Sequence, residues 1–272
     1  MATAAAAPGA GIALRSVPNL RDLGGWPTRA GGRVRRGLLF RSTELDRLQG
    51  DDLEAFTRLG VRFVYDLRTE AERRARPDRV PVGTREIVVD VLADSSGAAP
   101  AQLMALLEDP AAAARMLGAG KALTLFEQGY RQIVSLPSAV AAYHRLFTDL
   151  ADEDHRPALF HCTTGKDRTG WAAAVMLSVL GVSYDDVLRD YLLTNEQLLP
   201  AVRPLLDQFK AKGGDPDLLL PVLGVQKEYL EAAFNEMGAR FGSLKRYLSH
   251  GLKLGAGTVA TLRGAFVEPP GS

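Results

Sequence analysis

The chain has 272 residues and is close to neutral, with 33 lysine and arginine residues against 32 aspartate and glutamate residues. A net charge of +1 gives no reason to expect nucleic-acid or membrane-surface binding, although Arg21, Arg68, Lys166 and Arg168 are candidates for a local basic rim. For Arg21 and Arg68 the favoured expectation is a buried pair with an aspartate, which would brace a site without touching its ligand. The single cysteine excludes an intrachain disulfide and favours a reducing, cytoplasmic location, with secretion without a signal as the alternative. No apolar run is long enough to predict a transmembrane segment.

The predicted elements describe one domain over residues 12–267. Residues 1–11 are alanine-rich and lack the basic start of a secretory signal, so they predict a disordered tail, and 268–272 predict a loose C-terminus. Apolar and β-branched runs predict strands over 37–41, 61–67, 86–91 and 157–160. Helical patterns and stop signals predict helices over 51–59, 123–135, 139–149 and 171–180.

The C-terminal part of the chain is predicted to be helical, with helices over 184–193, 196–212, 221–237, 243–250 and 258–265. The glycines and proline at 213–217 predict a helical hairpin. The alanine-rich stretch 94–120 is interrupted by glycine and proline, which predicts a weakly specified segment or a short helix. Strands that alternate with helices predict an α/β fold, with a central mainly parallel sheet flanked by helices.

The most informative stretch runs from His161 to Gly170 and joins a short apolar strand to a helix. Such a turn directs successive backbone N–H groups at one point, next to the positive end of the helix dipole. Cys162 lies at the start of this anion site, where its thiolate is favoured. Arg168 follows after five residues and can pair with a phosphate through its planar guanidinium. These residues therefore predict a nucleophile within an anion-binding loop.

The sequence His-Cys-x5-Arg-Thr resembles the phosphate-binding loop of the cysteine-dependent protein-tyrosine phosphatases. The longer form Cys-x-x-Gly-Lys-Asp-Arg-Thr-Gly is similar to that of a bacterial group typified by mycobacterial members with dual-specificity and lipid phosphatase activity. Weaker similar segments occur in the expected order at 19–25, 39–45, 66–68, 190–195, 222–225 and 241–244. The resemblance implies a protein-tyrosine-phosphatase-like fold with a C-terminal helical lid at approximately 196–237. A packed helical layer is the alternative interpretation of that hairpin.

Each residue of the loop has an expected role. Cys162 is the predicted nucleophile, which would form a cysteinyl-phosphate, and Arg168 is predicted to stabilise the charge of the transition state. By resemblance, His161 orients the loop and supports the thiolate, and the Thr169 hydroxyl helps the thiolate to leave. The remaining substrate-binding residues are expected to donate backbone N–H groups: Thr163, Thr164, Gly165, Lys166 and Asp167.

The general acid is a role for which the sequence offers several candidates, because Thr28 follows Trp26-Pro27 where many tyrosine phosphatases have an acidic Trp-Pro-Asp segment. In the resembling group the aspartate within the loop has been assigned this role, so Asp167 is our choice. Asp90 and Asp94, which follow a predicted strand, are the alternatives.

Phosphotyrosine-containing proteins are the leading substrates, and inorganic phosphate is the product. The loop variant makes phosphoserine and phosphothreonine plausible, and phosphoinositides are the alternative if Lys166 binds a second phosphate. The four histidines lack metal-ligand spacing, so no metal or other cofactor is expected. A nucleotide-binding loop is excluded because Phe160 and Asp167 stand where glycine and Ser/Thr are needed. A phosphate-binding protein without activity and a sulfur-transfer enzyme are less favoured alternatives.

Overall fold

The computed structural model describes residues 6–95 and 106–270, and its centre is a five-stranded sheet. The strands are β1 (Arg21–Asp22), β3 (Leu39–Ser42), β4 (Phe63–Asp66), β5 (Arg85–Val88) and β6 (Ala158–His161). Their order is β1-β3-β6-β4-β5, in which β3, β6, β4 and β5 are parallel and β1 is antiparallel to β3. The four predicted strands therefore exist and form a mainly parallel sheet, which confirms the predicted fold class.

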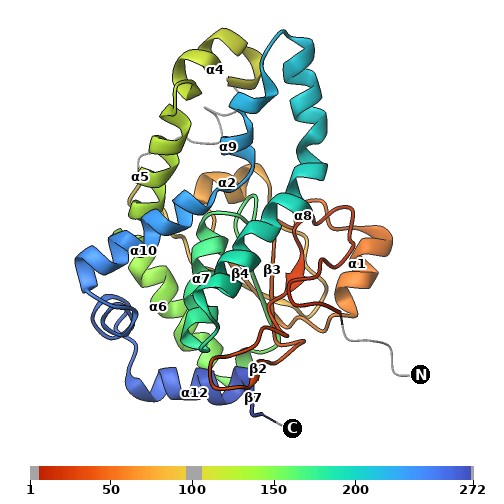
Figure 1. The fold of residues 1–272 in the computed structure, drawn as a ribbon. Helices are drawn as coiled ribbons and strands as arrows, with labels where there is room; N and C mark the ends of the chain where they lie inside the picture. Colours follow the sequence, from red (N-terminus) through yellow and green to blue (C-terminus); the bar gives the residue numbers. More distant parts are fainter. Residues whose placement is uncertain (1–5, 96–105, 271–272) are drawn as a thin grey trace.

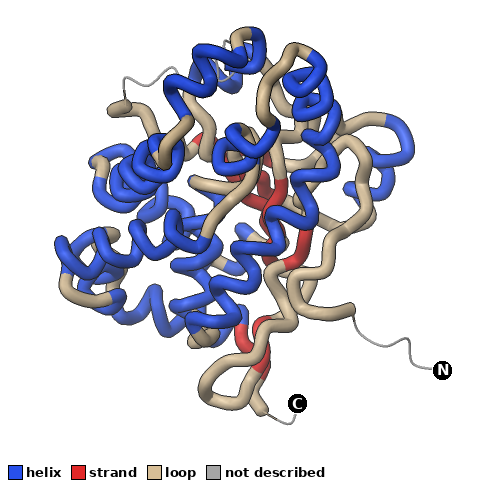
Figure 2. Tube along the Cα trace, turned by 45° about the horizontal axis from the view of Figure 1, so that its top comes forward, coloured by secondary structure: helices blue, strands red, loops and turns tan. Residues whose placement is uncertain are grey.

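Helices flank this sheet (Figures 1 and 2). The helices before the loop are α1 (Gly50–Thr57), α2 (Glu70–Ala75), α4 (Pro110–Leu117), α5 (Lys121–Ser135) and α6 (Pro137–Ala151). Those after it are α7 (Arg168–Val179), α8 (Tyr184–Ala211), α9 (Leu220–Leu223), α10 (Lys227–Phe241), α11 (Leu244–Arg246) and α12 (Ala256–Phe266). Single turns occupy Glu153–His155, Pro216–Leu218 and Tyr247–Gly251, and β2 (Arg33–Val34) pairs with β7 (Val267–Glu268).

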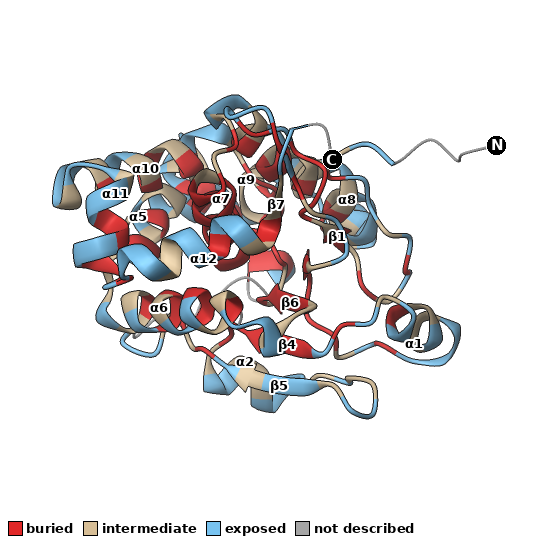
Figure 3. Cartoon of the chain, turned by 90° about the horizontal axis from the view of Figure 1, so that it is seen from below, coloured by how far each residue is buried: buried red, intermediate tan, exposed pale blue. Residues whose placement is uncertain are grey.

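The alternation of side chains along the strands divides the core between the two faces of the sheet. Tyr65 and Phe160 belong to the large core that includes α6 and α7, whereas Val64 and Leu159 belong to a smaller core that includes Phe56 of α1. Helix α7 is apolar on all sides and buried along almost its whole length, as the red ribbon in Figure 3 shows. The loop that precedes α7 is therefore attached to the most buried strand and helix.

The predicted helical hairpin differs from the structure in two places. The helices predicted over 184–193 and 196–212 are one continuous helix, α8, which Ser183 caps and which contains Pro200 and Pro204. The helix predicted over 221–237 is divided into α9 and α10 by an extended segment at Gly224–Gln226. Asn195, in the middle of α8, forms hydrogen bonds with both the N–H and the carbonyl of Val225. Its side chain therefore joins α8 to the segment between α9 and α10, and the helix continues past it.

The chain ends are more ordered than expected wherever the structure describes them. Gly11 forms a β-bridge with Arg21, and the Gly9 carbonyl accepts a hydrogen bond from Gln197, so these residues do not belong to a disordered tail. Glu268 pairs with Arg33 in the small sheet. Within the stretch 94–120, residues 96–105 lie outside the described residues, and 110–117 form α4. Across the described ranges, no helix has both the length and the apolar character that a membrane span needs.

Candidate active site

The carboxyl ends of the parallel strands meet at one edge of the sheet, and the His161–Gly170 stretch begins there. Ser42 at the end of β3 and Asp66 at the end of β4 are both in register with His161 at the end of β6. Ligand sites of open parallel sheets form at this edge, because the loops that follow neighbouring strands converge. Cys162 is the first residue after β6, and α7 begins at Arg168, so the predicted strand–loop–helix arrangement is present.

Donors from the N-terminal region hold the peptide groups of the loop from behind. The Gly165 carbonyl accepts hydrogen bonds from Asn19 Nδ2 at 3.0 Å and from Arg41 Nη2 at 2.7 Å. Gly165 has φ +65°, and a Cβ atom there would lie 2.2 Å from the Ser42 carbonyl oxygen. The Thr163 carbonyl accepts from the backbone N–H of Glu44 at 3.2 Å. Only glycine fits at position 165, and these contacts fix the direction of the peptide groups.

Arg21 and Arg68 do not contribute to a basic rim but form buried ion pairs behind the loop, which was the favoured expectation for both. Both side chains are fully buried. Arg21 and Arg41 pair with Asp190, at 3.0 Å and 2.8 Å respectively, and Arg68 pairs with buried carboxylates behind the loop. Burial tends to raise the pKa of Asp190, but the two guanidinium groups outweigh it and lower that pKa. These arginines therefore brace the site from inside the fold.

Arg168 forms a bidentate ion pair with Glu72, a residue that the sequence analysis did not single out. Nη1 donates to Oε2 at 2.7 Å and Nη2 donates to Oε1 at 2.7 Å. The Thr163 hydroxyl also donates to Glu72 Oε1, at 2.5 Å. Burial tends to raise the pKa of Glu72, but its hydrogen bonds and ion pair with Arg168 outweigh burial and hold the pKa well below the usual range. Glu72 therefore ties the guanidinium to the start of the loop.

The Lys166 ammonium lies under the break between α9 and α10, rather than at a solvated rim. Its Nζ donates to the Gly224 carbonyl at 3.2 Å and lies 3.2 Å from Asp167 Oδ1 and 4.3 Å from the centre of the Phe126 ring. Only 3% of the residue is exposed. The part of the predicted lid around Gly224 therefore contacts the anion-binding loop directly.

Three aspartates are candidates for the general acid. Asp167 Oδ1 accepts a hydrogen bond at 2.8 Å from Tyr130, which is itself bonded to the hydroxyl of Tyr191. Asp90 lies 3.8 Å from Arg73, and burial raises its pKa despite a lowering effect from Arg168. Asp94 Oδ2 accepts from the Ser138 backbone N–H at 2.6 Å and thereby caps the start of α6 on the surface. The structure thus places Asp167 in the loop and Asp90 within the field of Arg168.

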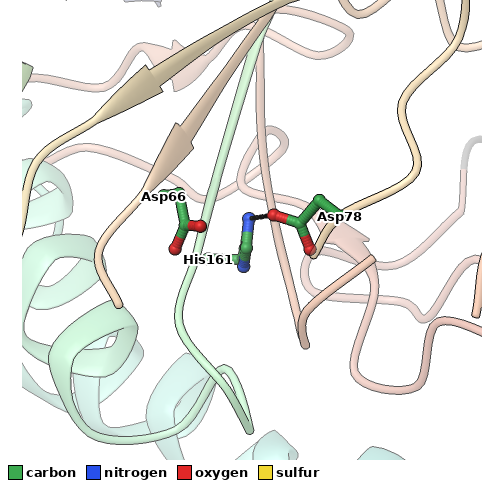
Figure 4. A group of neighbouring side chains, drawn as sticks. All are labelled: Asp66, Asp78 and His161. Atoms are coloured by element: carbon green, nitrogen blue, oxygen red, sulfur yellow. Dashed lines mark ion pairs between the residues drawn. The ribbon is translucent and has the colours of Figure 1, made fainter. Parts of the chain in front are cut away.

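A buried cluster of charges lies behind the loop. The side chains of His161 and Asp78 are both fully buried, and Nε2 of the ring lies 2.9 Å from Asp78 Oδ2 (Figure 4). Asp66, Asp78 and His161 are a group whose ligand atoms lie within 4.8 Å of one another, as a metal site would require. Arg68, however, bonds to both oxygens of Asp66 and lies 2.7 Å from Asp78 Oδ2. Because a guanidinium already neutralises these carboxylates, a divalent ion fits poorly here.

Thr169 follows Arg168 in the first turn of α7 and is fully buried. Its hydroxyl has no hydrogen-bond partner among the described residues. A buried hydroxyl without a partner is unusual in native proteins. The two supporting residues predicted from the sequence are His161, just before Cys162, and Thr169, just after Arg168. Both are fully buried.

Sequence reasoning missed Glu72, Tyr130 and Asp78. The pattern Thr69-x-x-Glu72 is a capping box, and the structure confirms both of its hydrogen bonds at the start of α2. That pattern predicts a helix start but not a contact with Arg168. Tyr130 and Asp78 carried no local signal, because a tyrosine within a helix and an aspartate beside a proline are ordinary features.

With the fold and the site described, the class of the protein follows from comparison. Residues 12–268 match the model of the tyrosine phosphatase family, so the chain belongs to that family. Membership supports phosphatase activity, a form of hydrolysis.

Two relatives match over most of their length. The chain is 32% identical over 268 residues to a "Putative tyrosine-protein phosphatase" of Cupriavidus necator, covering 94% of this chain and 88% of the relative. It is 31% identical over 283 residues to the triple specificity protein phosphatase PtpB of Mycobacterium tuberculosis, covering 94% of this chain and 100% of the relative. A tyrosine-protein phosphatase of Nostoc commune is 28% identical over 160 residues, which cover 58% of this chain and 48% of that protein. The family resemblance seen in the sequence is thereby confirmed.

Proposed function

We propose that this protein hydrolyses phosphotyrosine in proteins by double displacement through Cys162. The observation that carries the proposal is the strand–loop–helix unit in which Cys162 and Arg168 enclose one glycine-containing loop at the carboxyl edge of the sheet. The names of two relatives, which specify tyrosine, support the first choice of substrate. The name of a third relative, which specifies triple specificity, supports phosphoserine and phosphothreonine as additional substrates.

In the first step the Cys162 thiolate attacks phosphorus, and the P–O bond to the substrate breaks. The leaving oxygen takes a proton from Asp167, and a cysteinyl-phosphate remains. In the second step water attacks phosphorus and gives its proton to Asp167, while the P–S bond breaks and inorganic phosphate leaves. The buried Thr169 hydroxyl is suited to donate to the departing thiolate, because it has no partner among the described residues.

Arg168 would bind the non-bridging oxygens of the phosphoryl group in both steps. Glu72, the Leu67 carbonyl and the Thr163 hydroxyl accept hydrogen bonds from Nη1 and Nη2, so among the described contacts the Nε–H is the donor left for phosphate. Burial tends to lower the pKa of Arg168, but the charges of Cys162 and Glu72 outweigh it and raise that pKa further. The guanidinium is therefore charged throughout the reaction.

Asp167 is the proposed acid because it belongs to the loop and is held by the Tyr130 hydroxyl and the Lys166 ammonium. Asp90 is the second candidate, since its raised pKa is what a general acid needs. Asp94 is disfavoured because its carboxylate caps α6.

Phosphoinositides are the alternative substrates, and they would require Lys166 to bind a second phosphate. In the structure this ammonium is buried against Gly224 and Phe126. A second phosphate would therefore have to replace the Gly224 contact, and this requirement makes the lipid substrate the second choice.

The test is a panel of phosphotyrosine, phosphoserine and phosphothreonine peptides and a short-chain phosphoinositide, assayed for release of phosphate. We expect phosphotyrosine turnover, none with Cys162→Ser, and a phosphocysteine at Cys162 when the reaction with an aryl phosphate is quenched in acid. Faster turnover of the phosphoinositide would overturn the choice of substrate. Full activity of Cys162→Ser would overturn the mechanism.

A further inference from the structure

Two buried guanidinium groups share one carboxylate behind the loop. Arg21 Nε lies 3.0 Å and Arg41 Nη1 lies 2.8 Å from the oxygens of Asp190, and none of the three side chains is more than 1% exposed. The other acceptors of Arg21 are uncharged: the backbone carbonyls of Asn19 and Asp190 and the side chains of Asn19, Thr194 and Gln197. Arg41 has one further acceptor, the Gly165 carbonyl, at 2.7 Å.

This cluster carries one positive charge more than it neutralises. Arg21 forms two hydrogen bonds to the Asp190 carboxylate, at 3.0 Å and 3.4 Å, whereas Arg41 forms one. Within the described ranges, Asp190 is the one carboxylate that either guanidinium contacts. No described residue accepts a hydrogen bond from Arg41 Nε. A fully buried charge without a counterion is unfavourable, so the cluster favours an anion close to it.

The surplus charge lies directly behind the anion-binding loop. Arg41 Nη2 and Asn19 Nδ2 both donate to the Gly165 carbonyl, at 2.7 Å and 3.0 Å. In a planar trans peptide the N–H points opposite to the carbonyl, so the Lys166 N–H points away from Arg41. A cation at the carbonyl also strengthens that N–H as a donor, because linked hydrogen bonds polarise one another. Arg41 therefore acts on a donor that faces the other side of the loop.

The charges around Arg41 place it within the field of the site. Burial and the neighbouring Arg21 lower the pKa of Arg41 to about 10, while Asp190 raises it, so the guanidinium stays charged at neutral pH. A negative charge on Cys162 also raises this pKa. An anion at the mouth of the loop and the Arg41 guanidinium therefore attract each other.

The two cations of the loop itself already have partners. Arg168 forms its bidentate pair with Glu72, and Lys166 Nζ lies 3.2 Å from Asp167 Oδ1. In the part of the chain that the structure describes, Arg41 is the cation bonded to the loop that must share its carboxylate with a second cation.

We propose that Arg41 is a positioning residue that holds an unneutralised positive charge behind the loop, and that a phosphoryl group bound in the loop supplies the missing negative charge. The proposal rests on the proposed function, because it takes the loop as the phosphate site. Arg41 acts through the Gly165 peptide and through its charge, without touching the phosphate. Its buried charge destabilises the free protein, and a bound phosphate dianion offsets that cost.

Replacing Arg41 by Gln separates this role from bracing. Without Arg41, the Asp190 carboxylate keeps both hydrogen bonds from Arg21, and the Gly165 carbonyl keeps the one from Asn19. The remaining cluster is a neutral pair, and one buried charge is gone. We therefore expect the variant to fold, with an unfolding midpoint within about 3 °C of the wild type when no anion is present.

The experiment measures the binding of inorganic phosphate by calorimetry in a Cys162→Ser background, in which the nucleophile cannot react. We expect Arg41→Gln to weaken binding about tenfold, because a buried charge near the loop is lost. Arg41→Lys keeps the charge but cannot reach both partners, so binding should stay within about threefold. The control is Arg189→Gln, which removes an exposed cation next to Asp190 in the chain and should leave binding unchanged.

Thermal unfolding with and without phosphate gives a second readout. Phosphate stabilises each protein by an amount that grows with its affinity. The wild type should therefore gain more than Arg41→Gln, although the two start from similar midpoints. A residue that only braces the fold predicts the opposite pattern, namely a lower midpoint without anion and an equal gain with phosphate.

Three results would overturn the role of Arg41. They are unchanged phosphate affinity in Arg41→Gln, equal losses of affinity in the Gln and Lys variants, and a larger fall of the Arg41→Gln midpoint without anion than stated. Failure of the proposed function looks different, because the loop would then bind phosphate in an Arg41-dependent way while the wild type released none from phosphotyrosine. If the Cys162→Ser protein does not bind phosphate at all, both proposals are wrong.

Discussion

Glu72 and Arg168 form a bidentate ion pair, in which each oxygen of the carboxylate lies 2.7 Å from a different terminal nitrogen of the guanidinium. Glu72 is fixed at the start of α2, where the same carboxylate accepts the Thr69 backbone N–H at 2.9 Å. Two helices are thereby joined at the site, because α2 supplies the anion and α7 begins with the cation. The pair leaves Arg168 little rotational freedom before any phosphate binds, which is the preorganisation that transition-state binding requires.

Replacing Glu72 by Gln should therefore lower kcat/KM about tenfold, which corresponds to about 1.4 kcal/mol of transition-state stabilisation. The amide keeps the size of the side chain but loses the charge and one acceptor, so Arg168 is held less firmly. Steady-state kinetics with an aryl phosphate measures the effect. Glu70→Gln is the matched control, because Glu70 lies on the same helix in an exposed pair with Arg74. Equal losses in the two variants would argue against a specific role for Glu72.

The same pair predicts how stability depends on pH. The pKa of Glu72 is lowered in the folded protein, so its contribution is complete above the ordinary glutamate pKa of about 4.3 and is lost as the pH falls toward the folded value. The wild type should therefore lose more unfolding free energy than Glu72→Gln on acidification below about pH 5. Urea unfolding at a series of pH values compares them, and parallel curves would contradict the assignment.

A general acid must be protonated in the first step, so it produces the alkaline limb of the kcat/KM profile. Asp167→Asn should remove this limb and slow substrates with poor leaving groups about a hundredfold, while aryl phosphates with good leaving groups are affected much less. Asp90→Asn, which changes the second candidate, serves as the comparison. If the limb disappears only in Asp90→Asn, the acid is Asp90.

The sequence was sufficient for the parts of the site that are local in the chain. Cys162, Gly165 and Arg168 lie within one strand–turn–helix unit, and their spacing predicts an anion-binding loop without knowledge of the rest of the fold. Glu72 could not be predicted because it lies 96 residues from Arg168, and its capping box indicates only where a helix begins.

The partners of buried charges could not be predicted from the sequence. A buried bracing pair was expected for Arg21, but its partner is Asp190, which lies 169 residues away, and not the adjacent Asp22. The continuity of α8 was missed for a related reason. Thr194 and Asn195 are weak helix formers, yet Thr194 is buried and Asn195 bonds to Val225, so tertiary contacts override propensity.

Gly165→Ala should disrupt the loop. The residue has a positive φ, and the new Cβ atom would meet the Ser42 carbonyl at 2.2 Å, so we expect a loss of about 2–4 kcal/mol in stability and nearly complete loss of activity. Gly213→Ala is the control, because Gly213 also has a positive φ but no described atom lies within 4 Å of its Cβ position. Thermal unfolding and kinetics would distinguish crowding at Gly165 from the general cost of a left-handed alanine.

Access to Cys162 should depend on the contact between α8 and the break after α9. Asn195 donates to the Val225 carbonyl at 2.9 Å and accepts from its N–H at 2.8 Å, and the adjacent Gly224 carbonyl holds Lys166 of the loop. Asn195→Ala removes both hydrogen bonds, so the segment between α9 and α10 should move away from the loop more often. Cys162 is only 1% exposed, and we expect iodoacetamide to alkylate it about tenfold faster in this variant. Glu196→Ala, an exposed change on the same helix, is the control. Equal alkylation rates in the wild type and Asn195→Ala, with both proteins folded, would show that this contact does not limit access to the sulfur.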